Sequence, residues 1–243
     1  MINVERIRTA VVTGGSSGIG LAVARLLSND GLRLVVTGRD ERRLGEAAAR
    51  LGCRALRLDL SDRNSVDDLF RELGADPVDF FVANAGSLVR NPDDQRAETR
   101  GAVEVVSRAA ALVADGGVLA VTNTLFAHLP LERVPRLFRS YAEGKRDLAR
   151  QLAEVAAAYP GVRAVDVALG FVPGTRLLAQ VMSPAEAAEY ASKAASAALG
   201  GKLTTVRDAS EFLVRIIRHT AGGVRVGIDG SCTDLSEIVA LVP

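Results

Sequence analysis

Short apolar runs alternate along this chain with longer stretches in which apolar residues recur every three or four positions. The short runs are typical of buried strands, and the longer stretches are typical of amphipathic helices. The pattern predicts strands at 10–13, 32–37, 53–58, 77–82, 118–122, 162–168 and 224–228. It predicts helices at 18–29, 41–51, 64–73, 94–114, 141–158, 184–199 and 208–218.

Apolar strands that alternate with helices indicate an α/β, doubly wound fold: a single parallel sheet of about seven strands with helices on both faces. No linker rich in Pro, Gly or Ser and no internal repeat divides residues 1–243, so we expect a single domain. In such a sheet, ligands bind beyond the carboxyl ends of the strands. The residues that follow each predicted strand are therefore the candidates for a binding site.

Composition narrows the possible partners. The chain has 30 Lys and Arg against 29 Asp and Glu, a net charge of +1, and no basic block, so we expect no nucleic-acid partner. No apolar stretch approaches the roughly 18 residues of a membrane span, and the N-terminus lacks a signal-peptide pattern. Two cysteines, Cys53 and Cys232, make no disulfide framework. These features predict a soluble, cytoplasmic protein, and we expect no metal site.

The first predicted strand runs into a glycine-rich turn, T-G-G-S-S-G-I-G, and then directly into a helix. Gly14 and Gly18 suit positions where a side chain would strain the turn or block a phosphate, and Gly20 lets the helix pack close to the strand. Unpaired N–H groups and the helix dipole attract an anion, and a pyrophosphate fits best. Plain turn chemistry is the alternative.

The second predicted strand ends in V-V-T-G-R-D. A site specific for NAD usually has an acidic residue at this point, but this chain has Gly38 followed by Arg39. A guanidinium can pair bidentately with a 2′-phosphate, so Arg39 favours NADP(H) over NAD(H), unless it is only a solvated loop residue. Asp59 and Asn84 follow the next two strands, which places them at the expected cleft. Asp59 could instead cap the helix that follows, and Asn84 could serve only as a turn residue.

These motifs, with others in the same order, resemble the short-chain dehydrogenases/reductases. D-L matches the family's adenine contact, A-N-A-G its N-N-A-G, Y-A-E-G-K its Y-x-x-x-K, A-L-G-F-V-P-G-T its P-G-x-x-x-T, and G-I-D-G its V-D-G-G. The resemblance covers nearly the whole chain and implies a Rossmann fold that binds a dinucleotide. The implied cofactor-binding residues are Gly14, Ser16, Ser17, Ile19, Gly20, Arg39, Asp59, Leu60, Asn84, Ala85, Gly86, Lys145, Gly170, Val172 and Thr175.

Tyr141 and Lys145 lie four residues apart and share one helix face. An ammonium about 4 Å from a phenol favours the phenolate by roughly 4 kcal/mol, which would bring the tyrosine pKa near 7. The resemblance implies that Tyr141 gives a proton to a carbonyl as the nicotinamide delivers hydride, and that Lys145 also holds the nicotinamide ribose. Tyr190 and Lys193 form a competing pair, but they follow the strand at 162–168, so their order in the chain favours Tyr141.

Several residues depart from the family pattern. Thr124 stands where the family has its catalytic serine and keeps a hydroxyl, while Thr122 or Asn123 could take this role if the strand is shifted. Thr99 aligns with the family's structural asparagine, and Leu169 replaces a proline. An active but divergent enzyme is the expectation.

Two further groups have open interpretations. His128 could meet a substrate but fits a loop histidine better. A set of apolar residues could either line a substrate pocket or pack the core: Phe171, Leu177, Leu178, Val181 and Met182.

The sequence thus favours an NADP(H)-dependent oxidoreductase acting on a small-molecule carbonyl or secondary alcohol. The family implies a homo-dimer or homo-tetramer, and the Ala-rich helices at 94–114 and 141–158 would suit an interface. One alternative is a catalytically silent nucleotide-binding regulatory protein, which the departures at Thr99, Thr124 and Leu169 support. Another is an enoyl or imine reductase on the same scaffold.

Overall fold

The computed structural model describes residues 8–177, 181–197, 204–219, 223–227 and 232–233. The strands are β1 Thr9–Val12, β2 Arg33–Gly38, β3 Arg54–Arg57, β4 Val78–Ala83, β5 Val113–Thr124, β6 Arg163–Leu169, β7 Gly223–Gly227 and β8 Cys232–Thr233. The helices are α1 Gly18–Asn29, α2 Glu41–Leu51, α3 Arg63–Leu73, α4 Pro92–Ala110, α5 Arg139–Ala158, α6 Pro184–Ala197 and α7 Val206–His219. Three short 3-10 turns precede α5: η1 Leu125–His128, η2 Leu131–Arg133 and η3 Arg136–Phe138.

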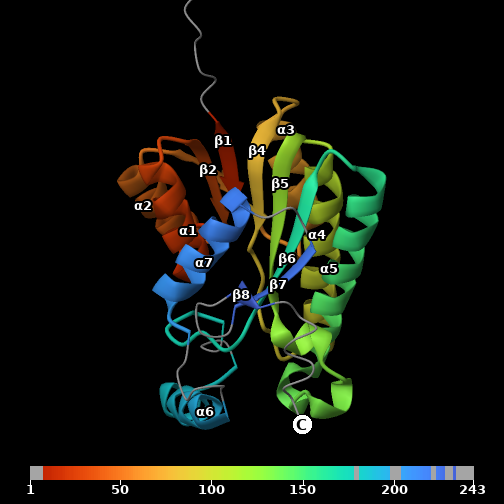
Figure 1. Cartoon of the computed structure of the whole chain (residues 1–243). Coiled ribbons are helices and arrows are strands. Elements are labelled where there is room, and N and C mark those ends of the chain that lie inside the picture. Colours follow the sequence, from red (N-terminus) through yellow and green to blue (C-terminus); the bar gives the residue numbers. More distant parts are fainter. Residues whose placement is uncertain (1–7, 178–180, 198–203, 220–222, 228–231, 234–243) are drawn as a thin grey trace, which may run out of the picture.

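The strands form one sheet in the order β3-β2-β1-β4-β5-β6-β7-β8 (Figure 1). Every neighbouring pair from β3 to β7 is parallel, and β8 adds to β7 in the antiparallel direction. The expected doubly wound parallel sheet is therefore confirmed, with the short β8 as an addition at its edge. The G-I-D-G motif lies mostly outside the described residues.

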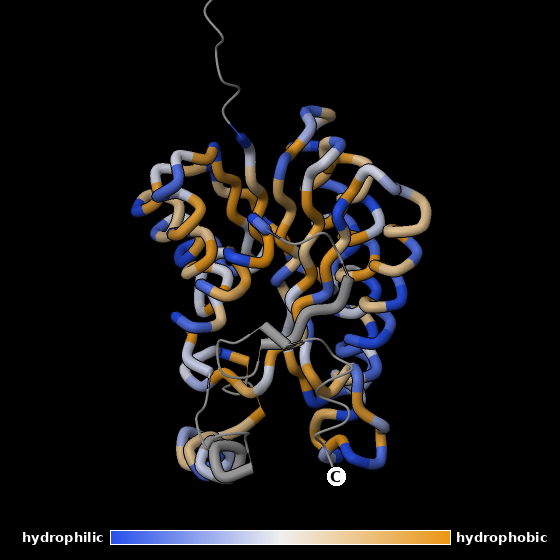
Figure 2. Tube along the Cα trace, viewed as in Figure 1, coloured by the Kyte–Doolittle hydropathy of each residue, from blue (hydrophilic) through white to orange (hydrophobic). Residues whose placement is uncertain are grey.

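Helices cover both faces of the sheet (Figure 1). Val12 contacts the apolar core beneath α1, α2 and α7, whereas its neighbour Val11 contacts the core beneath α3, α4 and α5. Successive residues of a strand point to opposite faces, and both faces are buried, so the strands are apolar throughout. Figure 2 shows this as hydrophobic colour concentrated in the strands and on the inward sides of the helices.

The predicted boundaries differ most from the structure between α4 and β5, where the strand expected at 118–122 spans Val113–Thr124. The helix expected to reach residue 114 ends at Ala110, and β5 begins soon after it at Val113. Val113 pairs with Val78 of β4, whose N–H donates a hydrogen bond of 2.8 Å to the Leu112 carbonyl. Pairing with the neighbouring strand therefore overrides the helical pattern of the sequence.

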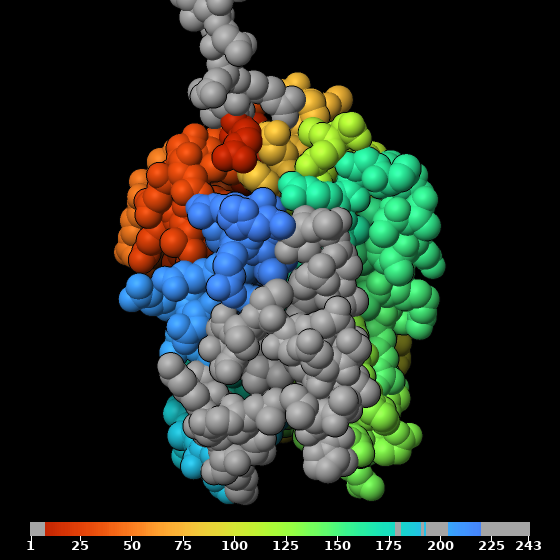
Figure 3. All heavy atoms as spheres, viewed as in Figure 1, coloured from red at the N-terminus to blue at the C-terminus, as the bar shows by residue number. Residues whose placement is uncertain are grey.

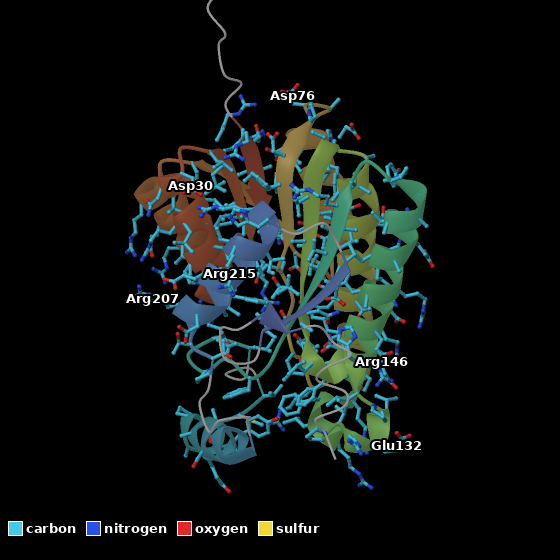
Figure 4. The ribbon with its side chains drawn as sticks, in the orientation of Figure 1. Asp30, Asp76, Glu132, Arg146, Arg207 and Arg215 are labelled. Carbon is cyan, nitrogen blue, oxygen red and sulfur yellow. The ribbon has the colours of Figure 1, made fainter. Side chains whose placement is uncertain are left out.

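The two ends of the sheet differ. Asp76 lies at one end and Glu132, in η2, at the other, where the carboxyl ends of the strands meet α6 and the 3-10 turns (Figures 1 and 4). On the face shown in Figure 3, α7 lies against α1, and Arg218 of α7 pairs with Asp30 just after α1. Among the described residues, no helix is long and apolar enough to cross a membrane.

Candidate active site

A cleft of about 670 Å³ opens at the carboxyl ends of the strands. Residues that follow β1, β2, β3, β4, β5 and β6 line it, as expected for a doubly wound sheet. All the predicted cofactor-binding residues line this cleft except Gly20, which lies beneath the glycine turn. The structure therefore brings together residues that are far apart in the sequence.

The glycine turn is too tightly packed for side chains. Gly14 has a φ of +67°, and a Cβ on it would lie 3.0 Å from the Cα of Ala85. A Cβ on Gly20 would lie 2.3 Å from the carbonyl oxygen of Gly14. The Asn84 amide fixes this approach by donating to the Thr13 carbonyl at 3.2 Å. Asn84 thus holds β1 and β4 together beneath the turn.

Helix α1 begins with an open N-terminus. Ser17 stands at its N-cap, but its side chain makes no capping hydrogen bond, and the first turn has no acidic residue. By contrast, Asp40, Asp62 and Asn91 cap α2, α3 and α4 with side-chain oxygens. Because Asp62 caps α3, Asp59 does not have that role. The N-terminus of α1 faces the cleft without a side-chain acceptor, which suits an anion.

One basic and two acidic side chains line the cleft near the ends of β2 and β3: Arg39, Asp59 and Glu98. Arg39 Nη1 lies 3.3 Å from Glu98 Oε1 of α4. Asp59 accepts a hydrogen bond of 2.7 Å from the Ser61 hydroxyl. Burial raises the pKa of Asp59, but the hydrogen bonds from Ser61 and the nearby Arg39 outweigh it, so the pKa is lowered. Asp59 is therefore a carboxylate at neutral pH.

Glu98 is a cleft residue that the sequence analysis missed. The alignment with the family's asparagine had selected Thr99, but the Thr99 hydroxyl donates to the Gln95 carbonyl at 2.9 Å and packs against Gly144. One step along an α-helix turns the side chain by about 100°, so the residue beside Thr99 faces the cleft instead. Burial raises the pKa of Glu98, and the carboxylate of Asp59 adds to that effect.

Tyr141 and Lys145 lie on the same side of α5, and both are buried at the cleft. Lys145 Nζ donates a hydrogen bond of 2.9 Å to the Thr122 carbonyl and lies 5.7 Å from the centre of the Tyr141 ring. A Cβ on Gly86 would lie 3.6 Å from Nζ. The glycine after β4 therefore leaves room for the ammonium in the cleft.

The sequence predicted a lowered pKa for Tyr141, and the structure gives a raised one. Burial raises the pKa of Tyr141 well above its usual value, and the Glu98 carboxylate raises it further. Burial also lowers the pKa of Lys145 to about 8, although Asp166 and Glu98 oppose this shift. The ammonium is engaged by the Thr122 carbonyl, and apolar side chains surround the phenol. Tyr141 is therefore protonated at neutral pH.

The residues at the end of β5 divide between the two faces of the sheet. Thr124 lines the cleft, and its hydroxyl accepts a hydrogen bond of 3.4 Å from the Phe126 N–H. The Asn123 amide donates instead to the backbone carbonyl of Lys145 at 3.2 Å. The Thr122 hydroxyl is buried and has no hydrogen-bond partner among the described residues. All three residues line the cleft, but only Thr124 is partly exposed.

A buried polar network supports α5 from below. Asp166 of β6 accepts a hydrogen bond of 3.1 Å from Asn123 and lies 3.2 Å from His128 Nε2. Arg146 of α5, labelled in Figure 4, donates to the Ala127 carbonyl at 3.1 Å and so holds η1. His128 thus contacts a buried carboxylate and does not line the cleft. Within the described ranges, no group of three or more His, Cys, Asp or Glu could hold a metal ion.

Aromatic side chains gather around Tyr141. The Phe138 ring lies 5.3 Å from the ring centres of both Phe126 and Tyr190, and Phe171 lies 5.2 Å from Tyr190. Tyr190, the competing tyrosine, is thus part of this aromatic wall, and burial raises its pKa. The wall makes this end of the cleft apolar.

The residues after β6 divide between the cleft and the core. Phe171 and Leu177 line the cleft, whereas Val181 is buried in the apolar cluster and Met182 packs against it. Leu178 lies outside the described residues. The Thr175 hydroxyl donates to the Val172 carbonyl at 3.1 Å, which closes a turn over the glycine-rich end of the cleft.

Residues 8–123 match the family described as short chain dehydrogenase. A curated relative, an uncharacterized short-chain type dehydrogenase/reductase of Sinorhizobium fredii, is 39% identical over 84 residues, which are 35% of this chain and 33% of the relative. The chain thus matches only about a third of the length of such curated relatives.

Solved structures extend the similarity to nearly the whole chain. A protein assigned as a betaketoacyl-ACP reductase is 30% identical with a TM-score of 0.74, and the match covers 92% of this chain and 97% of that one. A short chain dehydrogenase of Burkholderia cenocepacia in complex with NADP is 27% identical with a TM-score of 0.71, over the same shares, 92% and 97%. The chain belongs to the short-chain dehydrogenase/reductase family of oxidoreductases.

Proposed function

We propose that this protein is an NADP(H)-dependent oxidoreductase that transfers hydride between the nicotinamide and a carbonyl or secondary alcohol. One observation carries the proposal: Tyr141 and Lys145 line the same cleft as the glycine turn and Arg39. A proton donor and a dinucleotide cradle in one cleft are what this chemistry needs.

The residues present fit a phosphorylated dinucleotide. The open N-terminus of α1 would hold the pyrophosphate, and a side chain at Gly14 or Gly20 would collide with the backbone that shapes this cradle. Arg39 would hold the 2′-phosphate, and Lys145 the nicotinamide ribose. When bound, the cofactor supplies or accepts the hydride. The NADP complex of the Burkholderia relative supports this choice of cofactor.

The protonation state of Tyr141 suits the donation of a proton. The neutral phenol of Tyr141 is the form that can donate a proton to a carbonyl oxygen. Lys145, with a pKa of about 8, is mostly charged at neutral pH and would stabilise the phenolate that is left behind. The Thr124 hydroxyl would hold the carbonyl oxygen beside Tyr141.

The aromatic wall indicates the kind of substrate. Phe126, Phe138, Phe171 and Tyr190 leave few polar groups on that side of the cleft, so we propose a small molecule with an apolar group next to its carbonyl. The relative assigned as a betaketoacyl-ACP reductase supports a ketone.

The experiment has two stages. Thermal unfolding is first measured with NADPH and NADH, and NADPH oxidation is then followed with a panel of aliphatic and aryl ketones, enoyl compounds and imines. We expect a larger rise in the unfolding temperature with NADPH and turnover of apolar ketones. A larger rise with NADH contradicts the cofactor proposal, and turnover of enoyl compounds or imines alone contradicts the carbonyl proposal.

One observation favours a second candidate, a catalytically silent nucleotide-binding protein. Lys145 is held by the Thr122 carbonyl, and Tyr141 lies in an apolar cluster with a raised pKa. Binding of NADPH without turnover of any substrate in the panel would support this candidate.

Three broader features stay predictions: a single domain over residues 1–243, a cytoplasmic location, and a homo-dimer or homo-tetramer. Helices α4 and α5 pack side by side (Figure 1) and would form the interface. Light scattering that gives a monomeric mass contradicts the assembly.

A further inference from the structure

An ion pair crosses the cleft where the adenosine part of a dinucleotide would lie. Arg39, just after β2, and Glu98, on α4, both line the cleft, and Nη1 lies 3.3 Å from Oε1. Asp59, a second carboxylate, follows β3 and lines the same cleft. The guanidinium that would bind a 2′-phosphate therefore already has an anionic partner.

The two partners differ in their contact with solvent. The Glu98 side chain is 8% exposed, whereas the Arg39 side chain is 47% exposed. A buried carboxylate depends on its hydrogen-bonding partners, and here these are Arg39 and the Ser87 side chain. The guanidinium keeps one edge toward Glu98, and its exposed part can accept a second anion.

We propose that Glu98 sets the cofactor selectivity of the cleft, because it competes with the 2′-phosphate of the cofactor for Arg39. This inference rests on the proposed function, in which Arg39 binds that phosphate. An adenosine without the 2′-phosphate has no group that competes for the guanidinium. Glu98 thus limits the advantage of NADP(H) over NAD(H) without contacting the nicotinamide.

The charges give the direction of the effect. A 2′-phosphate carries nearly two negative charges at neutral pH, and bringing it to Arg39 places it near the Glu98 carboxylate. Like charges this close repel, and one guanidinium must then serve both anions. Glu98→Gln keeps the size and the hydrogen bond to Arg39 but removes the negative charge. The variant should therefore bind a 2′-phosphate more tightly.

The test uses fragments of the cofactor that cannot reach Lys145 or Tyr141. Calorimetry at one fixed salt concentration measures the binding of adenosine 2′,5′-bisphosphate and of adenosine 5′-monophosphate to the full chain. For Glu98→Gln we expect the bisphosphate to bind about threefold to tenfold more tightly and the monophosphate to be unchanged. Glu98→Ala removes the same charge with a different shape and should shift the bisphosphate in the same direction.

Glu72→Gln is the matched control, because Glu72 forms an exposed pair with Arg54 at 3.2 Å outside the cleft. It should leave the affinity for both fragments unchanged. Arg39→Ala should remove most of the preference for the bisphosphate, and adding Glu98→Gln to it should tighten bisphosphate binding by less than it does in the wild type, because the competition for Arg39 is gone and only the direct repulsion remains. The unfolding temperature of every variant is measured to check that the variant is folded.

The outcomes distinguish the inference about Glu98 from the assignment of the 2′-phosphate to Arg39. If Arg39→Ala removes the preference but Glu98→Gln leaves it unchanged or weakens it, the inference about Glu98 is overturned and the role of Arg39 stands. If Arg39→Ala leaves the preference intact, both the inference and the assignment of the phosphate to Arg39 are overturned.

Discussion

The family match covers the N-terminal half of this chain but not the C-terminal half, although both halves share one sheet. Residues 8–123 match the family and hold the glycine turn, Arg39 and Asp59. The match ends at residue 123. The part of the chain from Thr124 onward contains Tyr141 and the aromatic wall. The N-terminal half lines the cleft with the glycine turn and with charged side chains such as Arg39, whereas the C-terminal half lines it with Tyr141, Lys145 and aromatic side chains.

This difference has a physical reason. A phosphate cradle needs a close approach of backbone, and at Gly20 even one added carbon would meet a carbonyl oxygen at 2.3 Å. Few residue types satisfy such a position, so its sequence stays recognisable. The substrate side is built from loops and 3-10 turns that can change length and side chains without disturbing the sheet. Substitutions in the two halves should therefore have different consequences.

The largest effect is expected in the C-terminal half, at Tyr141. Tyr141→Phe removes the proton donor and should lower kcat by about 1000-fold on the best ketone of the panel. Binding of NADPH, measured by thermal shift, should persist because the N-terminal half is intact. Tyr190→Phe is the control and should change kcat by less than about threefold, since Tyr190 has the role of an apolar wall residue. The reverse order of effects would exchange the two assignments.

In the N-terminal half, Gly20→Ala should destabilise the protein by about 2–3 kcal/mol, because its Cβ has no space beneath the turn. NADPH binding should weaken with it. Gly45→Ala is the matched helical control, since a Cβ there meets nothing within 4 Å, and it should stabilise by about 0.5–1 kcal/mol. Urea unfolding measures both. Equal effects of the two substitutions would show that the close approach at Gly20 is not needed.

Lys145 predicts an unusual pH dependence of stability. Its pKa is about 8 in the folded protein against 10.5 for an unperturbed lysine, so between these values the unfolded chain binds more protons. The free energy of unfolding should then rise with pH, by about 2 kcal/mol from pH 8 to 10. The raised pKa of Tyr141 changes the free energy of unfolding in the opposite direction, but only above pH 10.0, the pKa of an unperturbed tyrosine.

The measurement compares urea unfolding of the wild type with that of Lys145→Met at pH 7, 8, 9 and 10. The difference between the two free energies should grow in favour of the wild type above pH 8 and stay constant below it. A constant difference over the whole range would mean that Lys145 keeps its ordinary pKa.

The smallest effect on activity is expected at Thr124, at the end of β5. Thr124→Ala should lower kcat/KM by about tenfold or more, because the substrate oxygen loses one hydrogen-bond donor. Thr124→Ser should restore most of the activity, since it keeps the hydroxyl. A loss well below tenfold for the alanine variant would show that this hydroxyl does not hold the carbonyl.

The sequence predicted the fold and the general position of the site well, since the strand and helix periods and the order of the motifs are local properties. It failed where a residue's partner lies elsewhere in the chain. Glu98 was not predicted, because its position in the cleft depends on α4 packing near Arg39, which lies far from it in the sequence. The helix that begins at Pro92 was predicted to extend too far, because Val113 pairs with Val78 in the sheet and does not continue the helix.

The sequence alone determined the parallel sheet, the glycine turn and the spacing of Tyr141 and Lys145, because these depend on local pattern and on residues with special backbone freedom. Only the tertiary structure decided how charge is distributed in the cleft. It paired Arg39 with Glu98, held Lys145 on the Thr122 carbonyl, and buried Tyr141 so that its pKa rises instead of falling. Burial and electrostatic partners come from distant segments, so no spacing in the sequence could have fixed them.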